Sequence, residues 1–199
     1  DGLWIYCKIR HRQEERVALF RYAEKKFALN QSETTRRLWG RLVARATTPA
    51  VSQKHFDTAL EIAQQHIDLA EVAFCLEQSG HAAYATQEYD KALQFYEQSL
   101  SLYRQLGDDY ATAEILFLRH VSDNRTDWDY LKSYRDESLR LRRAIGDRVG
   151  TGWSLAPAAL HEGRLGHFAE AEQLWSERVV LGQETGNLAL VATGYGHLS

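Results

Sequence analysis

The chain has 199 residues, of which 44% are hydrophobic and 26% charged, with only two prolines and a formal net charge of −3. This balance excludes an intrinsically disordered chain and is typical of a folded helical protein. No apolar run approaches the ~20 residues needed to cross a bilayer, and no charged-then-apolar leader opens the sequence. We therefore expect a cytoplasmic protein.

The cysteines and histidines do not form a metal-binding pattern. Cys7 and Cys75 lie too far apart for a structural zinc site and are too few for a disulfide framework. His161 and His167 are six positions apart with two glycines between them, whereas a zinc-protease helix needs histidines four apart on one face. We expect neither a metal nor another cofactor.

Helices are predicted along the chain wherever apolar residues recur at three-and-four spacing. The first spans about Glu14 to Leu29, and the next clear pattern begins at Phe56. Altogether we expect about ten antiparallel helices and no strand. The clearest apolar faces are Tyr89, Ala92, Leu93, Tyr96, Ser99 and Leu100, then Trp128, Leu131, Tyr134, Ser138 and Leu139, then Phe168, Ala171, Leu174, Trp175 and Val179.

One predicted helix contains residues that disfavour a helix. Pro157 follows Gly150 and Gly152 within what should be the first helix of a hairpin. An internal proline removes a hydrogen bond and costs ~3 kcal/mol unless the helix bends or starts later. We expect a kink or a shifted helix start here.

A similar helix-ending motif, in which Gly is followed by Asp or Asn, occurs three times, as Leu-Gly-Asp at 106–108, Ile-Gly-Asp at 145–147 and Thr-Gly-Asn at 185–187. The resulting period of 39 to 40 residues is typical of stacked helical hairpins. Each glycine should take the left-handed conformation that ends a helix, and the following polar residue should cap the next helix. The residues concerned are Gly107, Gly146 and Gly186, followed by Asp108, Asp147 and Asn187.

These hairpins resemble the tetratricopeptide repeat (TPR) family, whose pattern is an aromatic, two residues, Leu-Gly, two residues, Tyr, then Ala, three residues, Phe, and a closing Pro. The best match to this pattern is Leu76-x-x-Ser79-Gly80-x-x-Ala83 followed by Ala92-x-x-x-Tyr96. Weaker matches begin at Ile115 and Leu155. The closing Pro is missing from all of them, and the period is ~5 residues longer than the usual 34.

The resemblance implies an all-α, right-handed superhelical solenoid of antiparallel helix hairpins, forming a single repeat domain over residues 1–199. Both ends of the sequence fall within apolar patterns, so we expect a fragment of a larger protein. Long units ending in Leu-Gly-Asp also resemble the helical sensor arrays of large bacterial signalling ATPases and transcriptional regulators. The approximate hairpins are 1–30, 31–66, 67–106, 107–146 and 147–186, with a partial one at 187–199.

In such arrays the first helix of each hairpin lines the concave surface. The resemblance therefore implies a groove with a mixture of aromatic and polar side chains, suited to a peptide, a protein segment or a polar small molecule. The predicted groove residues are Phe74, Glu77, His81, Tyr84, Leu116, His120, Asp123, Asn124, Trp153 and Arg164. About half of them could equally belong to the core between repeats.

Charge is distributed unevenly along the chain. Residues 1–54 hold 12 basic and 5 acidic side chains, whereas residues 55–199 hold 12 and 22. A basic stripe near Trp39 could contact nucleic acid. It could also be a solvated helix face, or dock the acidic part of a neighbouring subunit. The stripe consists of Arg36, Arg37, Arg41 and Arg45.

No nucleophile, paired-carboxylate or metal arrangement indicates an enzyme. The sequence favours a non-catalytic protein-interaction or ligand-sensing module of a bacterial signalling or transcriptional regulator, whose partner is a protein, a peptide or another domain of the same parent chain. One alternative is a scaffold that forms homo-oligomers through uncapped apolar ends. A less favoured alternative is nucleic-acid contact through the basic amino-terminal third.

Overall fold

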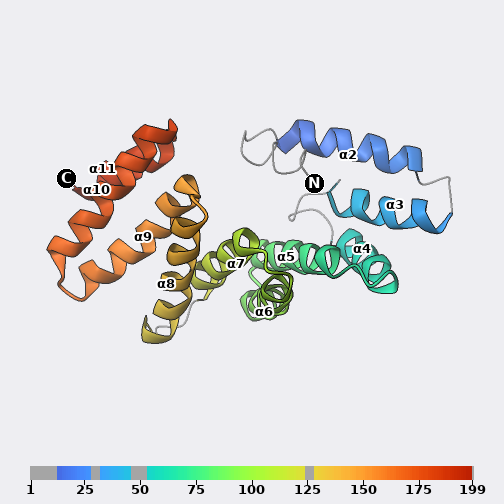
Figure 1. Cartoon of the computed structure of the whole chain (residues 1–199), viewed down its shortest axis with the longest axis horizontal. Helices are drawn as coiled ribbons and strands as arrows, with labels where there is room; N and C mark the ends of the chain where they lie inside the picture. The colour runs from blue at the N-terminus through green and yellow to red at the C-terminus, as the bar shows by residue number, and fades with distance from the viewer. Residues whose placement is uncertain (1–12, 28–31, 46–52, 124–127, 199) are drawn as a thin grey trace. The chain divides into compact units, whose positions relative to one another are not determined.

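The computed structural model describes residues 13–27, 32–45, 53–123 and 128–198, and this part of the chain contains ten helices and no strand (Figure 1). The predicted all-α class is thereby confirmed for these residues. None of the described helices combines the length and the apolar character required to cross a membrane. The helices are α2 (Gln13–Phe27), α3 (Glu33–Arg45), α4 (Gln53–Gln65), α5 (Leu69–Ala85), α6 (Tyr89–Leu106), α7 (Asp109–Ser122), α8 (Trp128–Ala144), α9 (Arg148–Arg164), α10 (Phe168–Thr185) and α11 (Leu188–Leu198).

The chain divides into two compact units, residues 1–102 and 103–199, with the boundary inside α6. We call these the N-terminal unit and the C-terminal unit. In the N-terminal unit each helix from α2 to α5 packs against the next, and in the C-terminal unit the same holds from α7 to α11 (Figure 1). Helices two apart also touch, as α3 does with α5, and α9 with α11. Packing is therefore mostly between neighbours in the sequence.

The three repeated endings are left-handed helix stops. Gly107, Gly146 and Gly186 have φ angles of 67°, 72° and 68°, a conformation that glycine adopts without steric cost. The predicted stops are confirmed. Left-handed residues also occur at Ile67, Gln87 and Gly166, so the stop recurs about once per helix rather than once per hairpin.

The polar residue after each repeated glycine caps the next helix, as predicted. Asp108 Oδ1 accepts a hydrogen bond from the backbone N–H of Ala111 at 2.9 Å. Asp147 Oδ1 accepts one from Gly150 at 2.9 Å. Asn187 does the same for Leu190 at 3.2 Å. Each cap satisfies a backbone donor that the first turn of a helix leaves unpaired.

A second repeated feature is a hydrogen bond between the two helices of each hairpin. The hydroxyl of Ser99 on α6 donates to the carbonyl of Ala73 on α5 at 2.9 Å. Ser138 on α8 makes the equivalent bond to Ala113 on α7 at 2.8 Å. At the corresponding position of α10 the donor is Arg178, which bonds to a carbonyl of α9. The contacts between the two helices of a hairpin therefore recur with the same period as the repeated helix endings in the sequence.

Helix α9 runs from Arg148 through Pro157 to Arg164. The predicted shifted start is therefore wrong, because Asp147 caps the helix at its expected beginning. Pro157 lies inside the helix, where it cannot donate to the carbonyl of Trp153 one turn earlier. The kink stays a prediction.

Candidate functional site

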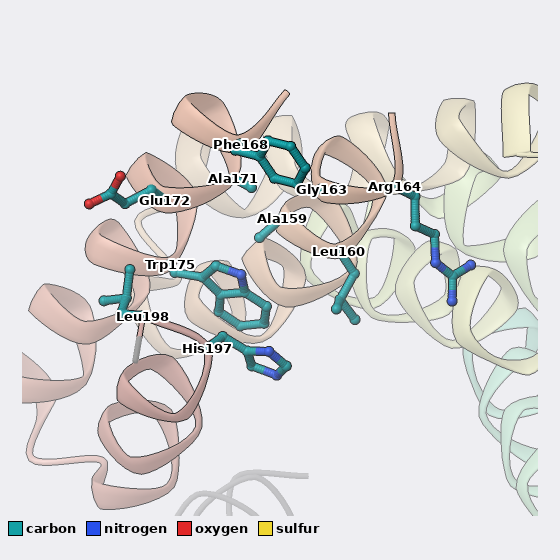
Figure 2. Close-up of a pocket in the computed structure, with 10 residues that line it drawn as sticks. All are labelled: Ala159, Leu160, Gly163, Arg164, Phe168, Ala171, Glu172, Trp175, His197 and Leu198. Atoms are coloured by element: carbon teal, nitrogen blue, oxygen red, sulfur yellow. The ribbon is translucent and has the colours of Figure 1, made fainter. Parts of the chain in front are cut away.

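A cavity of about 550 Å³ lies among α9, α10 and α11 of the C-terminal unit (Figure 2). Its volume falls within the ~300–1,000 Å³ typical of ligand sites. All three helices belong to the same unit, so the cavity is formed by elements that pack directly on one another. Its lining consists of Ala159, Leu160, Gly163, Arg164, Phe168, Ala171, Glu172, Trp175, His197 and Leu198.

Small residues create the space between α9 and α10. Ala159 and Ala171 are buried, and a Cβ built on Gly163 would lie 3.9 Å from the Cβ of Ala171. No side chain larger than a methyl group therefore fills this part of the helix interface. The neighbouring indole of Trp175, only 5% exposed, forms one wall of the resulting space (Figure 2).

His197 on α11 stacks on Trp175, with ring centroids 4.1 Å apart and an interplanar angle of 10°. Glycine permits this approach, because a Cβ built on Gly194 would lie 2.5 Å from Cγ2 of Val179 on α10. Gly194 precedes His197 by three residues, so both occupy the same side of α11. The close helix crossing at Gly194 thus brings the imidazole onto the indole.

Arg178 ties together the three helices that line the cavity. Its side chain on α10 donates to the carbonyl of Gly152 on α9 and to Thr193 Oγ1 on α11, the latter at 2.7 Å. The guanidinium also lies 4.9 Å from the ring centroid of Trp153 and 6.0 Å from that of Trp175. Burial lowers the pKa of Arg178. Within the described ranges, no carboxylate forms an ion pair with it.

Phe168 was predicted to lie on the packed face of α10, but its side chain is 73% exposed, so that prediction is wrong. Phe168 is the first residue of the helix, and its ring projects at the edge of the cavity instead of into the core (Figure 2). Leu160 on α9 is also exposed, at 45%. The cavity therefore offers two apolar side chains to a partner.

Arg164 and Glu172 extend to opposite sides of this apolar lining (Figure 2). Arg164 closes α9, whereas Glu172 lies in the second turn of α10. The two charged groups thus flank an apolar centre.

Four residues of the predicted groove lie on α5 in the N-terminal unit. Phe74 and Glu77 are buried, at 8% exposure each. Nδ1 of His81 shares a hydrogen bond of 3.2 Å with the hydroxyl of Tyr96 on α6. Tyr84 is more exposed and meets the ring of Tyr89 edge-on, with centroids 5.6 Å apart. These contacts are between the two helices of one hairpin.

Three more predicted groove residues lie on or just after α7 in the C-terminal unit. Leu116 is completely buried, so its side chain packs in the core, the alternative that the sequence left open for about half of these residues. Nδ1 of His120 lies 3.1 Å from the carbonyl of Leu131, and burial lowers the pKa of the imidazole. Asp123 is buried 3.8 Å from the guanidinium of Arg119.

The remaining predicted groove residues have different positions. Trp153 lies over Arg178, as described above, and Asn124 falls outside the described residues. Of the ten, Arg164 lines the cavity. Phe168 and His197 also line the cavity, but neither was predicted as a residue of this site. Their exposure was not predictable from helical periodicity, which placed Phe168 in the core.

The predicted basic stripe on α3 faces carboxylates of its own chain. Arg37 and Arg41 both donate to Asp68, which caps α5, at 2.8 and 2.7 Å. Arg45 donates to Glu71 at 2.6 Å, and both side chains are buried. Burial acts to raise the pKa of Asp68, but the hydrogen bonds from the two arginines outweigh it and hold the pKa below its ordinary value. Arg36, the fourth member, is exposed.

Within the part of the chain that the structure describes, no three His, Cys, Asp or Glu side chains are grouped so as to hold a metal ion. The sequence matches no protein-family model and no curated protein.

Proposed function

We propose that the chain is a non-catalytic recognition module, built as a right-handed solenoid of TPR-like hairpins, that binds a peptide or protein segment in the cavity among α9, α10 and α11. It would act as the sensing or docking part of a larger cytoplasmic regulator. The observation that carries the proposal is the cavity itself, with exposed Phe168 and Leu160 beside the stack of Trp175 and His197.

The hairpin geometry supports the resemblance to the TPR family. In the best-matched hairpin, a Cβ built on Gly80 would lie 2.5 Å from Cε1 of Tyr96, so the glycine of the motif makes room for the aromatic residue of the next helix. The hydrogen bond from Ser99 to Ala73 recurs from Ser138 to Ala113 one repeat later. Both contacts are what a repeated helix pair requires.

The composition of the cavity supports recognition. Large exposed apolar side chains beside an aromatic stack favour burial against a partner, at roughly 1.5–3 kcal/mol for each side chain fully covered. Charged residues at the edge add selectivity more than affinity. A concave, mostly apolar site with few polar groups is the usual form of a ligand site.

A displayed library of random short peptides, panned against the whole chain, tests this function. We expect enriched peptides that bind the unaltered protein and bind the Phe168→Ser variant at least tenfold more weakly, because the variant removes the most exposed apolar wall. The matched control is Leu188→Ser. Leu188 is 79% exposed on α11 but does not line the cavity, so its loss should leave binding unchanged.

Two results would contradict the proposal. One is a panning experiment in which no sequence is enriched over a control selection without protein. The other is a set of enriched peptides that bind Phe168→Ser and Leu188→Ser equally well, which would place recognition elsewhere on the chain.

A further inference from the structure

We infer that exposed ion pairs between second helices set the angle between successive hairpins of the C-terminal unit, and that this angle therefore responds to salt. The inference concerns the hairpin of α7 and α8 and the hairpin of α9 and α10, and it is independent of the proposed function. It rests on a difference between the two edges along which these hairpins meet: one is closed by buried packing, and the other is joined by charged side chains at the surface.

The packed edge lies where α8 meets α9. These two helices pack directly on each other. The hydroxyl oxygens of Ser138 on α8 and Ser154 on α9 lie 3.4 Å apart, and both side chains are buried. Leu155 on α9 is also completely buried. Close-packed interiors resist deformation, so this edge can serve as the axis about which one hairpin turns relative to the next.

The open edge lies between the second helices of the two hairpins, α8 and α10. Within the described residues, these helices do not form one of the extensive helix contacts of the unit. Arg143 on α8 instead reaches across to Glu177 on α10, where one guanidinium nitrogen donates to both carboxylate oxygens at 2.7 and 2.8 Å. The two side chains are 49% and 39% exposed. A solvated ion pair thus spans the edge that packing leaves open.

The same ion pair occurs one repeat earlier. Arg104, in the part of α6 that belongs to the C-terminal unit, donates to Glu137 on α8 at 2.7 Å. These side chains are also partly exposed, at 47% and 34%. The two arginines are 39 positions apart and the two glutamates 40, which is the period of the repeated helix endings. A contact that recurs with the repeat belongs to the stacking of hairpins and not to one local surface.

Exposed ion pairs are weak enough for solution conditions to change them. Losing one such pair should alter the ratio of open to closed arrangements of two hairpins about twofold to fivefold. At ~1 M salt the Debye length is only about 3 Å, so attraction across the open edge is largely screened, whereas buried contacts are screened much less. Small rotations add up along stacked repeats. Salt should therefore open the second-helix edge while the first edge stays packed.

Pulsed electron paramagnetic resonance between two nitroxide labels measures this opening in the whole chain. The labels are attached at Ser133→Cys on α8 and Gln173→Cys on α10, which are exposed and occupy equivalent positions of successive repeats. Cys7→Ser removes a competing thiol. Cys75 can stay, because it is completely buried and burial raises the pKa of its thiol. The distance distribution should broaden and shift to longer distances between ~0.05 M and ~1 M sodium chloride.

Charge variants identify the pair responsible. At low salt, Arg143→Glu places like charges across the open edge and should raise the open population at least about twofold. The double variant R143E/E177R restores an opposite pair and should restore the original distances. Arg140→Glu is the matched control, because it makes the same charge change one turn earlier on the exposed side of α8 and should leave the distances unchanged. If Arg143→Glu does not fold, Glu177→Gln removes the pair without repulsion and should also open the edge.

The inference is overturned if the distances between α8 and α10 are the same at low and high salt and in every variant. It is also overturned if Arg140→Glu changes them as much as Arg143→Glu, since the overall charge of α8 would then set the angle. Equal changes in the single variant and in R143E/E177R, with both proteins folded by circular dichroism, would show that the side chains act through packing and not as a pair. None of these results affects the proposed peptide binding, which depends on other residues.

Discussion

The N-terminal and C-terminal units contain the same kind of helical hairpin, but the buried arginines that join their helices do not all have the same kind of partner. In the N-terminal unit, charged pairs join α3 to α5, including the buried pair of Arg45 and Glu71. In the C-terminal unit the buried Arg142 pairs with Glu114 between α8 and α7 at 2.7 Å, but the buried Arg178, which joins α10 to α9 and α11, bonds to neutral oxygen atoms. The repeated hairpin therefore determines which helices meet, but not the chemistry that holds them together.

The two units also differ in which residues adopt the left-handed conformation at their turns. In the C-terminal unit every left-handed residue within the described ranges is a glycine, as at Gly146 and Gly186. In the N-terminal unit the equivalent positions are Ile67 and Gln87. A β-branched residue pays a steric cost in this conformation that glycine avoids. The N-terminal unit thus has strained turns, whereas the C-terminal unit has relaxed ones.

The largest effect should come from breaking the buried pair of the N-terminal unit. Glu71→Ala leaves the guanidinium of Arg45, only 6% exposed, without its 2.6 Å partner. Removing one member of a buried pair typically costs ~3–5 kcal/mol, because a charge stays desolvated. We expect a loss of about 3 kcal/mol in the stability of this unit. Hydrogen exchange measured by mass spectrometry should show faster exchange in α3 to α5, with α9 to α11 unchanged.

The double variant R45L/E71L is the matched control. It removes both charges and should recover most of the lost protection, since apolar pairs of similar volume often replace buried ion pairs without net cost. Equal destabilisation by the single and the double variant would show that packing around these positions matters more than their charges.

The second prediction perturbs the glycine crossing of the C-terminal unit. Gly194→Val places a branched side chain where even a Cβ would lie 2.5 Å from Val179, so α11 must move away from α10. Overpacking of this kind costs about 1–3 kcal/mol. The stack of His197 on Trp175 should be lost, and peptide binding should weaken with it. Urea unfolding followed by tryptophan fluorescence measures the first effect, and fluorescence anisotropy of a labelled peptide the second.

Gly196→Val is the control for this experiment, because a Cβ at that position would meet no atom within 4 Å. It should change stability by no more than about 0.5 kcal/mol. If both valine variants destabilise the protein equally, the effect comes from the helix propensity of α11 and not from its crossing with α10.

As the pH falls, the C-terminal unit should lose stability before the N-terminal unit does. Burial lowers the pKa of His120 below its ordinary value of 6.5, and the nearby Arg135 and His161 lower it further. An imidazole with a depressed pKa takes up a proton more readily when the chain is unfolded. Its contribution to stability is therefore present above pH ~6.5 and is lost as the pH falls from there toward the depressed value.

Asp68 in the N-terminal unit behaves as a carboxylate with a depressed pKa. Its contribution is present above the ordinary value of 3.8 and is lost only as the pH falls from there through the lower folded value. Hydrogen exchange corrected for its intrinsic pH dependence should show α7 to α9 opening between pH 7 and 5.5, with α3 to α5 still protected. His120→Gln should suppress the early loss, and Arg135→Met should reduce it. An identical pH profile for both units would contradict this prediction.

Part of the fold was predictable because it depends on local chemistry. Gly107, Gly146 and Gly186 identify helix ends, since only glycine takes the left-handed conformation freely, and the polar residue after each of them identifies a cap. Ile67 and Gln87 occupy the same conformation without a glycine to indicate it, so the sequence showed one stop per hairpin instead of one per helix.

The candidate site was less predictable because it depends on contacts between distant residues. The basic stripe showed its charge in the sequence, but its partner Asp68 lies 31 positions after Arg37. Phe168 fits an apolar helical face, yet as the first residue of α10 it projects at the cavity edge instead of into the core. Periodicity predicts which side of a helix is apolar, but not where that side lacks a covering neighbour.

The smallest predicted effect tests the strained turns. Ile67→Gly removes the steric cost of a branched residue at φ 53°, roughly 1–2 kcal/mol, but adds the backbone entropy of glycine in the unfolded chain, about 0.5–1 kcal/mol. Ile67 is 81% exposed, so little packing is lost. We expect the N-terminal unit to gain about 0.5 kcal/mol, measured as slower exchange in α4 and α5. The converse change in the C-terminal unit, Gly146→Ile, should destabilise α8 and α9, since the added strain then has no entropic compensation large enough to offset it. If Ile67→Gly destabilises the protein instead, the exposed isoleucine must contribute more to packing than its strain costs, and the two units would not differ in the quality of their turns.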